Sequence, residues 1–139
     1  MAQLNFHKTI ITVPRVKLKI LQKLICTYKL WQEFICHFPK GSRYALAIKI
    51  DFCFLEVIEN TYSASREKIN HKLKFVNLAS IKLDLLKFLL QISWETKALN
   101  NKRYILLSQK LDEIGRMLGQ WLENLRKLPA KDREKEDSF

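Results

Sequence analysis

Glycine and proline are scarce in this chain of 139 residues, which contains three of each. Both residue types mark turns and interrupt regular structure, so their scarcity excludes a fold built from many short strands. Long hydrophobic runs are also missing, because Lys or Glu interrupts every candidate before the roughly 18 apolar residues that a membrane span needs. The N-terminus lacks the apolar core and small-residue cleavage site of a signal peptide. We therefore expect a cytoplasmic, all-α protein without a membrane partner.

Motifs for catalysis and metal binding are missing as well. The cysteines Cys26, Cys36 and Cys53 have no Cys-x-x-Cys spacing and lie in apolar stretches, so we expect buried, reduced thiols. The three histidines have no acidic or thiol companion at ligand spacing. No Glu-x-x-His, P-loop, His-Glu-x-x-His or nucleophile-elbow sequence occurs. The sequence therefore predicts a protein that is not an enzyme and holds no metal or cofactor.

Acidic residues are too few to balance the basic ones, which leaves a net charge of +11. The excess is uneven: residues 1–41 carry seven Lys or Arg against Glu33 alone, and residues 65–101 carry seven against three acids. A surface that serves solubility alone usually mixes both signs of charge. The segregation therefore favours a surface that binds a polyanion.

Apolar residues recur at helical spacing through most of the chain. The clearest case is Lys102–Leu125, in which every third or fourth residue is apolar: Tyr104, Leu107, Leu111, Ile114, Leu118, Trp121 and Leu125. The same pattern predicts helices over Val16–Phe38, Arg43–Tyr62 and Arg66–Leu99, with the last helix ending near Pro129. Four helices with short connections predict an antiparallel up-down-up-down bundle over residues 16–128. Residues 1–15 are expected to form an extended arm and residues 129–139 a charged, flexible tail.

The connections are predicted from turn and capping residues. Pro39-Lys40-Gly41 should break the first helix, and Ser42 is a candidate N-cap for the second. The polar stretch Asn60–Ser65 should form the next turn. Asn100-Asn101 should form the last one, because Asn tolerates the left-handed conformation and also caps helices. Six residues of the second helix are expected to face inward: Tyr44, Ala47, Ile48, Phe54, Leu55 and Ile58.

The third predicted helix carries two apolar stripes, one more than a monomeric bundle needs. The first comprises Ile69, Leu73, Val76, Leu83, Leu86 and Leu90, and the second comprises Phe75, Leu78, Leu85, Leu89 and Ile92. Burial on both sides of the helix predicts a homo-oligomer. Gly115 and Gly119 should each cost roughly 0.8–1 kcal/mol inside a helix, which favours a close approach of a second helix there. The predicted oligomer interface therefore comprises Phe75, Leu78, Leu85, Leu89, Gly115 and Gly119.

Lysines of the first and third helices are expected to form one surface that contacts nucleic-acid phosphates. Lysine acts as a point charge and does not read base edges as arginine does, so little sequence specificity is expected. The candidate nucleic-acid-binding residues are Lys17, Lys19, Lys23, Lys29, Arg43, Lys72, Lys74, Lys82, Lys87, Lys102 and Arg103. The alternative is an ordinary solvated face. Trp31, Trp94 and Trp121 lie on or beside apolar seams, where core or interface roles are favoured over base stacking.

Three segments in order resemble one known family: Phe38–Glu59 (FPKGSRYALAIKIDFCFLEVIE), Lys72–Glu95 (KLKFVNLASIKLDLLKFLLQISWE) and Asn101–Leu122 (NKRYILLSQKLDEIGRMLGQWL). They are similar to the accessory variability determinant (Avd) proteins of diversity-generating retroelements, over about residues 16–127. The resemblance implies a four-helix bundle that assembles as a ring-like homopentamer in the cytoplasm of a bacterial or phage-infected cell. It also implies RNA and DNA as partners, together with the element's reverse transcriptase, which copies a template-repeat RNA into mutated cDNA.

A related family leaves an alternative open. Four-helix-bundle proteins encoded in intervening sequences of bacterial 23S rRNA genes share much of the same pattern. That resemblance implies a structural protein that binds ribosomal RNA or has no specific ligand. The strong positive charge favours the retroelement type.

Overall fold

The computed structural model describes residues 15–41 and 44–128, with side chains from Lys19 onward. These ranges contain no strand and form four helices: α2 (Arg15–Ile35), α3 (Tyr44–Arg66), α4 (Ile69–Glu95) and α5 (Asn101–Arg126). The all-α prediction is confirmed. The expected tail, the candidate cap Ser42 and the expected arm lie outside the described residues, except that Arg15 already begins α2.

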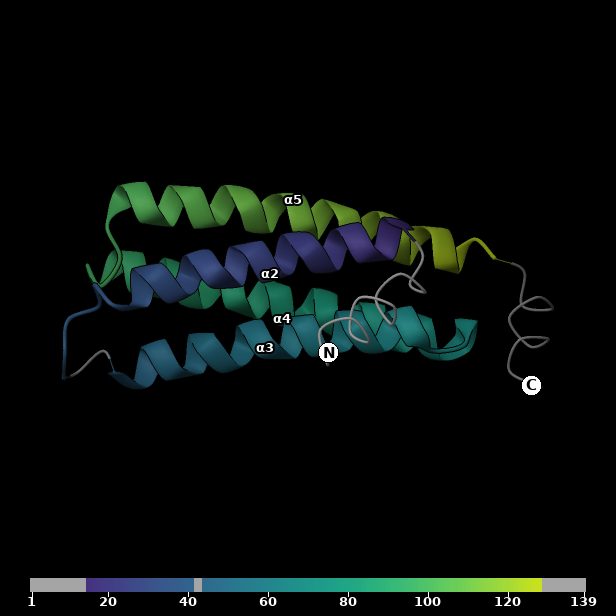
Figure 1. The fold of residues 1–139 in the computed structure, drawn as a ribbon, viewed down its shortest axis with the longest axis horizontal. Coiled ribbons are helices and arrows are strands. Elements are labelled where there is room, and N and C mark those ends of the chain that lie inside the picture. The colour runs from purple at the N-terminus through teal and green to yellow at the C-terminus, as the bar shows by residue number, and fades with distance from the viewer. Residues whose placement is uncertain (1–14, 42–43, 129–139) are drawn as a thin grey trace, which may run out of the picture.

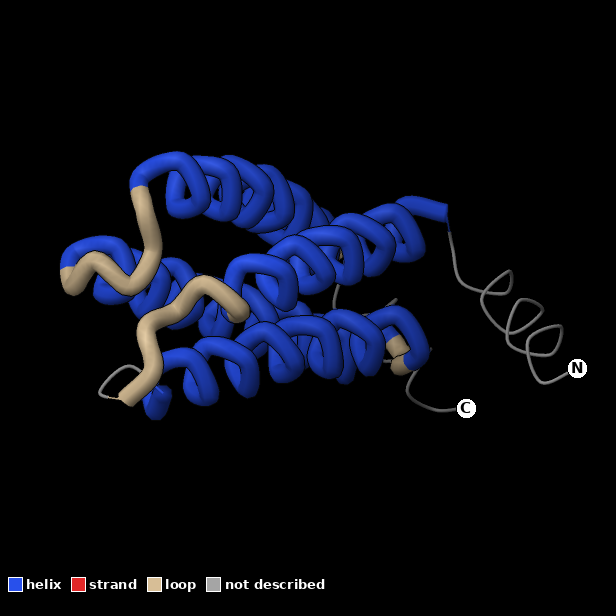
Figure 2. The backbone as a smooth tube through the Cα atoms, turned by 60° about the vertical axis from the view of Figure 1, so that its left-hand side comes forward, coloured by secondary structure: helices blue, strands red, loops and turns tan. Residues whose placement is uncertain are grey.

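The four helices run side by side as an elongated bundle (Figures 1 and 2). Each helix packs against its neighbours in the chain, and α5 returns to pack against α2. Neighbouring helices are antiparallel: Lys23 of α2 meets Glu113 of α5, whereas Phe34, later in α2, meets Arg103, earlier in α5. This is the predicted up-down-up-down bundle, in which α2 and α4 occupy diagonal corners.

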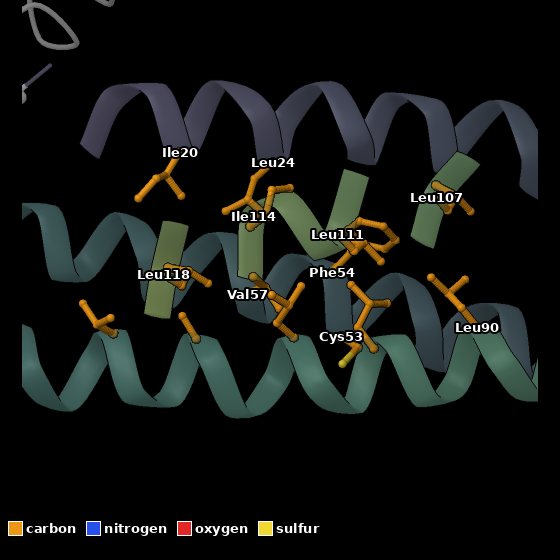
Figure 3. Close-up of a cluster of buried hydrophobic side chains, with 14 of the residues drawn as sticks. Ile20, Leu24, Cys53, Phe54, Val57, Leu90, Leu107, Leu111, Ile114 and Leu118 are labelled. Carbon is orange, nitrogen blue, oxygen red and sulfur yellow. The ribbon is translucent and has the colours of Figure 1, made fainter. Parts of the chain in front are cut away.

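The core is a continuous apolar cluster along the bundle axis (Figure 3). The predicted seam of α5 is confirmed: its first residue, Tyr104, is half-buried against the core, and the other six are buried, namely Leu107, Leu111, Ile114, Leu118, Trp121 and Leu125. The first stripe of the neighbouring helix α4 supplies Val76, Leu83, Leu86 and Leu90 to the same core. Trp31 and Phe54 are the largest fully buried side chains and stack with ring centroids 6.0 Å apart, joining α2 to α3.

A polar contact fixes the pairing of α2 with α3 beside this aromatic pair. The Asp51 carboxylate oxygen Oδ1 accepts hydrogen bonds from Tyr28 Oη at 2.9 Å, Gln32 Nε2 at 2.8 Å and Trp31 Nε1 at 3.3 Å. Burial, together with the hydrogen bond to Asp51, raises the pKa of Tyr28. Three donors from α2 therefore converge on one acceptor of α3, and this fixes the register of the two helices.

The predicted turn at Asn60–Ser65 is wrong, because α3 continues to Arg66. The polar side chains bond to the helix itself: Thr61 Oγ1 donates to the Val57 carbonyl at 2.7 Å, and Asn60 Nδ2 donates to the Glu56 carbonyl at 2.8 Å. Thr61 and Ala64 are also buried against the core. Polar residues that satisfy themselves within a helix do not end it.

The turn between α4 and α5 differs from the prediction in one detail. Asn100 caps α5 as expected, since its side chain accepts a hydrogen bond from the Arg103 backbone N–H at 2.9 Å. The left-handed residue is Lys97, with φ of 66°, and not an asparagine. Helix α4 ends at Glu95, four residues before the predicted Leu99. Helix α2 also ends earlier than predicted, at Ile35 instead of Phe38.

Burial of the cysteines was predicted too broadly. Cys53 is buried, and its thiol donates to the Lys82 carbonyl at 3.2 Å. Burial raises the pKa of this thiol. Cys26 and Cys36 are exposed: Cys26 lines a shallow groove between α2 and α5, and Cys36 directly follows the last residue of α2.

Candidate nucleic-acid interface

The predicted lysines do not form a single surface within one protomer. Because α2 and α4 are diagonal in the bundle, another helix separates their candidate lysines. Lys23 and Lys87 flank α5, where they pair with Glu113 and Asp112, whereas Lys82 pairs with Glu56 of α3. The prediction of one shared surface was based on the net charge of each sequence segment. Which lysines lie next to each other depends instead on which helices are neighbours in the bundle. Arg43 and the side chain of Lys17 lie outside the part that the structure describes.

Several of these lysines pair with carboxylates of a neighbouring helix. Lys82 of α4 contacts Glu56 of α3 at 2.9 Å, and the hydrogen bond with Glu56 raises the pKa of Lys82. On the other side of α4, Lys87 contacts Asp112 of α5 at 3.1 Å. The sequence indicated that these lysines have no carboxylates to pair with. That prediction is wrong for Lys82 and Lys87, because their acidic partners come from other helices.

The remaining α4 lysines have different surroundings. Lys72 Nζ donates to the Ala64 carbonyl at 3.2 Å, near the end of α3. A cation there stabilises the C-terminal end of the helix. Lys74 is exposed and lies 6.0 Å from the centroid of the Phe75 ring. Of the predicted α4 cations, Lys74 is the most available to a ligand.

A shallow groove between α2 and α5 gathers basic side chains. It has a volume of about 350 Å³ and is lined by Lys19, Gln22, Lys23, Cys26, Thr27, Lys110 and Glu113. Glu113 accepts a hydrogen bond from Lys23 at 2.8 Å, and this bond lowers the pKa of Glu113. Lys19 and Lys110 are exposed, and no carboxylate in the described ranges pairs with them. The groove therefore keeps a positive charge after its one acid is neutralised.

Lys110 was missed by the sequence reasoning. It occurs in a helix of nearly balanced charge, so segment totals did not single it out. The sequence feature that could have identified Lys110 is its spacing: it lies one helical turn before Glu113, on the side of α5 that faces α2. Helical spacing relative to a neighbouring helix therefore identifies it where composition does not.

The basic side chains continue along the same pair of helices towards the start of α5. A second depression there is lined by Leu30, Phe34, Asn100, Lys102, Arg103 and Leu106, with no acid among them. The Arg103 guanidinium lies 5.7 Å from the centroid of the Phe34 ring. We call the side formed by both depressions, with Lys19, Lys23, Lys110, Lys102 and Arg103, the α2–α5 face. Lys29 is exposed on α2 and adds a further cation near it.

Two apolar stripes remain exposed on different sides of the bundle. On α3, next to the Asp51 contact with α2, the stripe contains Ile48, Phe52, Leu55 and Tyr62. On the outer side of α4, Ile81 and Phe88 are exposed, and Phe88 also lines a depression between α4 and α5. Exposed apolar patches of this kind are typical of surfaces that bind another protein.

The predicted facing of α3 was partly wrong, because Tyr44, Ile48 and Leu55 are exposed. Ala47, Phe54 and the half-buried Ile58 contribute to the interior as expected. On α4, the predicted interface residues Phe75, Leu78, Leu85 and Leu89 are half-buried, and three of them, Phe75, Leu85 and Leu89, already pack against the core. Ile81 and Phe88, which the second stripe omitted, are the more exposed positions on that helix.

The two glycines of α5 differ in their surroundings. A Cβ on Gly115 would lie 3.1 Å from Lys87 Nζ and 3.4 Å from Leu83 Cδ2, whereas a Cβ on Gly119 would meet no atom within 4 Å. Within one protomer, the predicted close approach of a helix is therefore absent at Gly119, and at Gly115 it involves only side chains. Contact of these glycines with another copy stays a prediction.

Gly119→Ala tests that assignment. If nothing packs against Gly119, the alanine should raise the free energy of unfolding by about 0.8–1 kcal/mol through helix propensity alone. Urea unfolding followed by circular dichroism measures this change, and Gly115→Ala serves as the comparison in which Lys87 must move. Destabilisation by Gly119→Ala, or a smaller oligomer at unchanged helicity, would show that another chain packs there.

The described ranges contain no helix that is long and apolar enough to cross a bilayer. In the same part of the chain, no three His, Cys, Asp or Glu side chains come together as a metal site would require.

Comparison with known proteins identifies the family. A family model described as bAvd-like matches residues 9–125. Searches of curated proteins and of solved structures found no match. The matched range extends from before α2 almost to the end of α5 and includes all three segments on which the resemblance was based. The chain therefore belongs to the bAvd-like family.

Proposed function

We propose that this protein is a non-catalytic accessory subunit of a diversity-generating retroelement. It binds the template-repeat RNA and its cDNA, and it associates with the element's reverse transcriptase. The observation that carries the proposal is the family match over residues 9–125, because this accessory role is what the resemblance to Avd proteins implies. The reverse transcriptase enters as a partner through that resemblance alone.

The α2–α5 face supplies the chemistry for nucleic-acid binding. Lys19 and Lys110 are exposed at one depression, and at the other Lys102 is exposed next to Arg103, whose guanidinium lies over the Phe34 ring. Ammonium groups neutralise phosphates without reading base edges, so the face suits a polyanion of any sequence. An accessory protein that handles both a template RNA and the resulting cDNA needs this tolerance.

We propose that the protein assembles head to tail into a homopentamer. The number of five copies comes from the family resemblance. The head-to-tail arrangement is inferred from the two exposed apolar stripes. The exposed stripes of α3 and α4 are different and lie on different sides of the bundle. A ring needs two such complementary surfaces on every copy, whereas a symmetric dimer needs only one. Assembly would also repeat the basic face around the ring.

The ribosomal-RNA alternative makes a different genomic prediction. A retroelement protein is encoded beside a reverse-transcriptase gene and a pair of template and variable repeats. An intervening-sequence protein is encoded within a 23S rRNA gene. The location of the gene therefore separates the two roles without a biochemical assay.

Removing charge from the α2–α5 face should weaken nucleic-acid binding and its dependence on salt. In the double variant Lys19→Gln/Lys110→Gln, the slope of log affinity against log salt concentration for duplex DNA should become less steep by about 1.8. This change corresponds to about 0.9 for each phosphate that the variant no longer neutralises. Fluorescence anisotropy over a salt series measures the slope, and circular dichroism confirms that helicity is unchanged.

The matched control is Lys49→Gln/Arg66→Gln, which removes the same two charges from exposed positions on α3. Its slope should equal that of the parent. Lys82 and Lys87 are unsuitable for this test, because both contact carboxylates of neighbouring helices and their loss would disturb packing. Equal slopes for the two double variants would show that total charge, and not the α2–α5 face, governs binding.

A further inference from the structure

Trp94 is an exposed aromatic side chain next to the last residue of α4, close to the turn that leads to α5. Its relative exposure is 39%, compared with 0% for Trp31 and 9% for Trp121. A core or interface role was favoured for all three tryptophans; the core role is confirmed for Trp31 and Trp121, whereas Trp94 is exposed and an interface role for it stays a prediction. A large, exposed ring needs an explanation beyond the packing of the bundle.

Two contacts hold the Trp94 ring in one orientation. The ring lies almost parallel to that of Tyr104, with centroids 5.1 Å apart and an interplanar angle of 11°. The indole N–H donates a hydrogen bond to the side-chain oxygen of Asn101. Asn101 and Tyr104 both lie at the start of α5, so this helix holds the N–H edge of the indole and covers one of its two faces.

The backbone beneath the ring is also well ordered. The turn after Trp94 is closed by hydrogen bonds from Lys97 N to the Trp94 carbonyl at 3.0 Å and from Ala98 N to the Ser93 carbonyl at 2.8 Å. Asn100 then caps α5 through the Arg103 backbone N–H. A ring fixed in this way loses little conformational freedom when a planar ligand stacks on it.

Cations surround the same helix end. Lys102 is exposed, Arg103 is supported by the Phe34 ring at 5.7 Å, and Lys97 is exposed in the turn. The depression that Lys102 and Arg103 line contains no acid. Glu95, the acid adjacent to Trp94, accepts a hydrogen bond from Gln91 at 3.2 Å. The three cations therefore outnumber Glu95 at this end of the bundle, while Asp84 and Asp112 lie farther along the depression that Tyr104 lines.

We propose that this end of the bundle binds single-stranded nucleic acid, with a base stacked on Trp94 and backbone phosphates held by Lys102 and Arg103. The inference rests on the proposed nucleic-acid-binding function and names the form of ligand preferred where α4 connects to α5, beside the Lys102 and Arg103 end of the α2–α5 face. Aromatic rings beside cations are the usual means of binding single strands without sequence preference. In a duplex, by contrast, the faces of the bases are already stacked on each other.

The test compares Trp94→Leu with Trp94→Phe in the full chain, using a short oligothymidylate as the single strand and, as the duplex, a hairpin of mixed sequence closed by a non-nucleotide linker. Trp94→Leu should weaken binding of the oligothymidylate by about 5- to 150-fold, the effect of losing one stacked base. Trp94→Phe keeps an aromatic ring and should retain most of the affinity. Affinity for the hairpin should be unchanged in both variants.

A second readout comes from tryptophan fluorescence. Because Trp31 and Trp121 are buried, the oligothymidylate should quench mainly the emission of Trp94, and the quenching should be absent from Trp94→Phe. Light scattering and thermal unfolding are measured on the same samples. Trp94→Leu loses the contacts with Tyr104 and Asn101, so its melting temperature should fall, and binding is compared at a temperature where every variant is fully folded. Unchanged oligomer mass at that temperature would support a binding role for the ring.

The outcomes separate this inference from the proposed function. If the parent binds the hairpin and Trp94→Leu binds the oligothymidylate as tightly as the parent does, the stacking site is wrong while nucleic-acid binding stands. A smaller oligomer in Trp94→Leu would assign the ring to a contact between copies and overturn the inference. If the parent binds neither probe at low salt, the proposed nucleic-acid-binding function fails together with the site.

Discussion

Replacing Phe54 with Ala should lower the free energy of unfolding by about 3–5 kcal/mol, the usual cost of removing a buried Phe. Phe54 is fully buried, stacks on Trp31 and meets the Tyr28 ring edge-on at 5.7 Å. The cavity would therefore open where α2 joins α3, the pair of neighbouring helices with the sparsest contact. Urea unfolding followed by circular dichroism measures the loss.

Phe52→Ala is the matched control two positions away. Phe52 has a relative exposure of 60%, so its loss should leave the stability of the separate protomer nearly unchanged. Any effect through assembly should depend on protein concentration, whereas the effect of Phe54→Ala should not. Equal destabilisation by the two variants at every concentration would show that α3 presents a different face to the core.

The architecture could be predicted because the main apolar periods are long and regular. The seam of α5 runs from Leu107 to Leu125, and buried positions follow its spacing throughout. The errors arose where a second signal competed with that period. Asn60 and Thr61 have the composition of a turn, but their side chains bond to carbonyls within the helix. Ile48 and Leu55 are as hydrophobic as core residues, yet they lie on an exposed stripe.

The basic site could be predicted less well, since it depends on which helices adjoin. The sequence shows an excess of lysine in two segments, but not that the corresponding helices are diagonal. Lys82 and Lys87 counted as free cations until Glu56 and Asp112 were brought beside them by packing. Lys110 was hidden by the balanced charge of its own segment and became a candidate only beside Lys19. Pairings across helices need the arrangement of the bundle, which single-helix patterns do not contain.

The second large effect concerns assembly. Phe88→Lys on α4 and Phe52→Lys on α3 should each convert the oligomer into a folded monomer, because each places a charge on one of the two exposed stripes. Phe88 has a relative exposure of 57% and Phe52 of 60%, so neither change disturbs the core. Light scattering at micromolar concentration should give the mass of five chains for the parent and of one chain for each variant. Lys74→Ala, on the same helix as Phe88, is a surface change that should leave the mass of the parent unaltered.

Mixing the two variants tests the direction of assembly. In a head-to-tail ring, the α3 stripe of one copy meets the α4 stripe of the next. Phe88→Lys keeps an intact α3 stripe and Phe52→Lys an intact α4 stripe, so an equimolar mixture should form a dimer that cannot grow further. If each stripe instead bound its own kind, the mixture would contain only the species that each variant forms alone. A parent that stays monomeric at all protein and salt concentrations would contradict both arrangements and leave the two apolar stripes to a different partner.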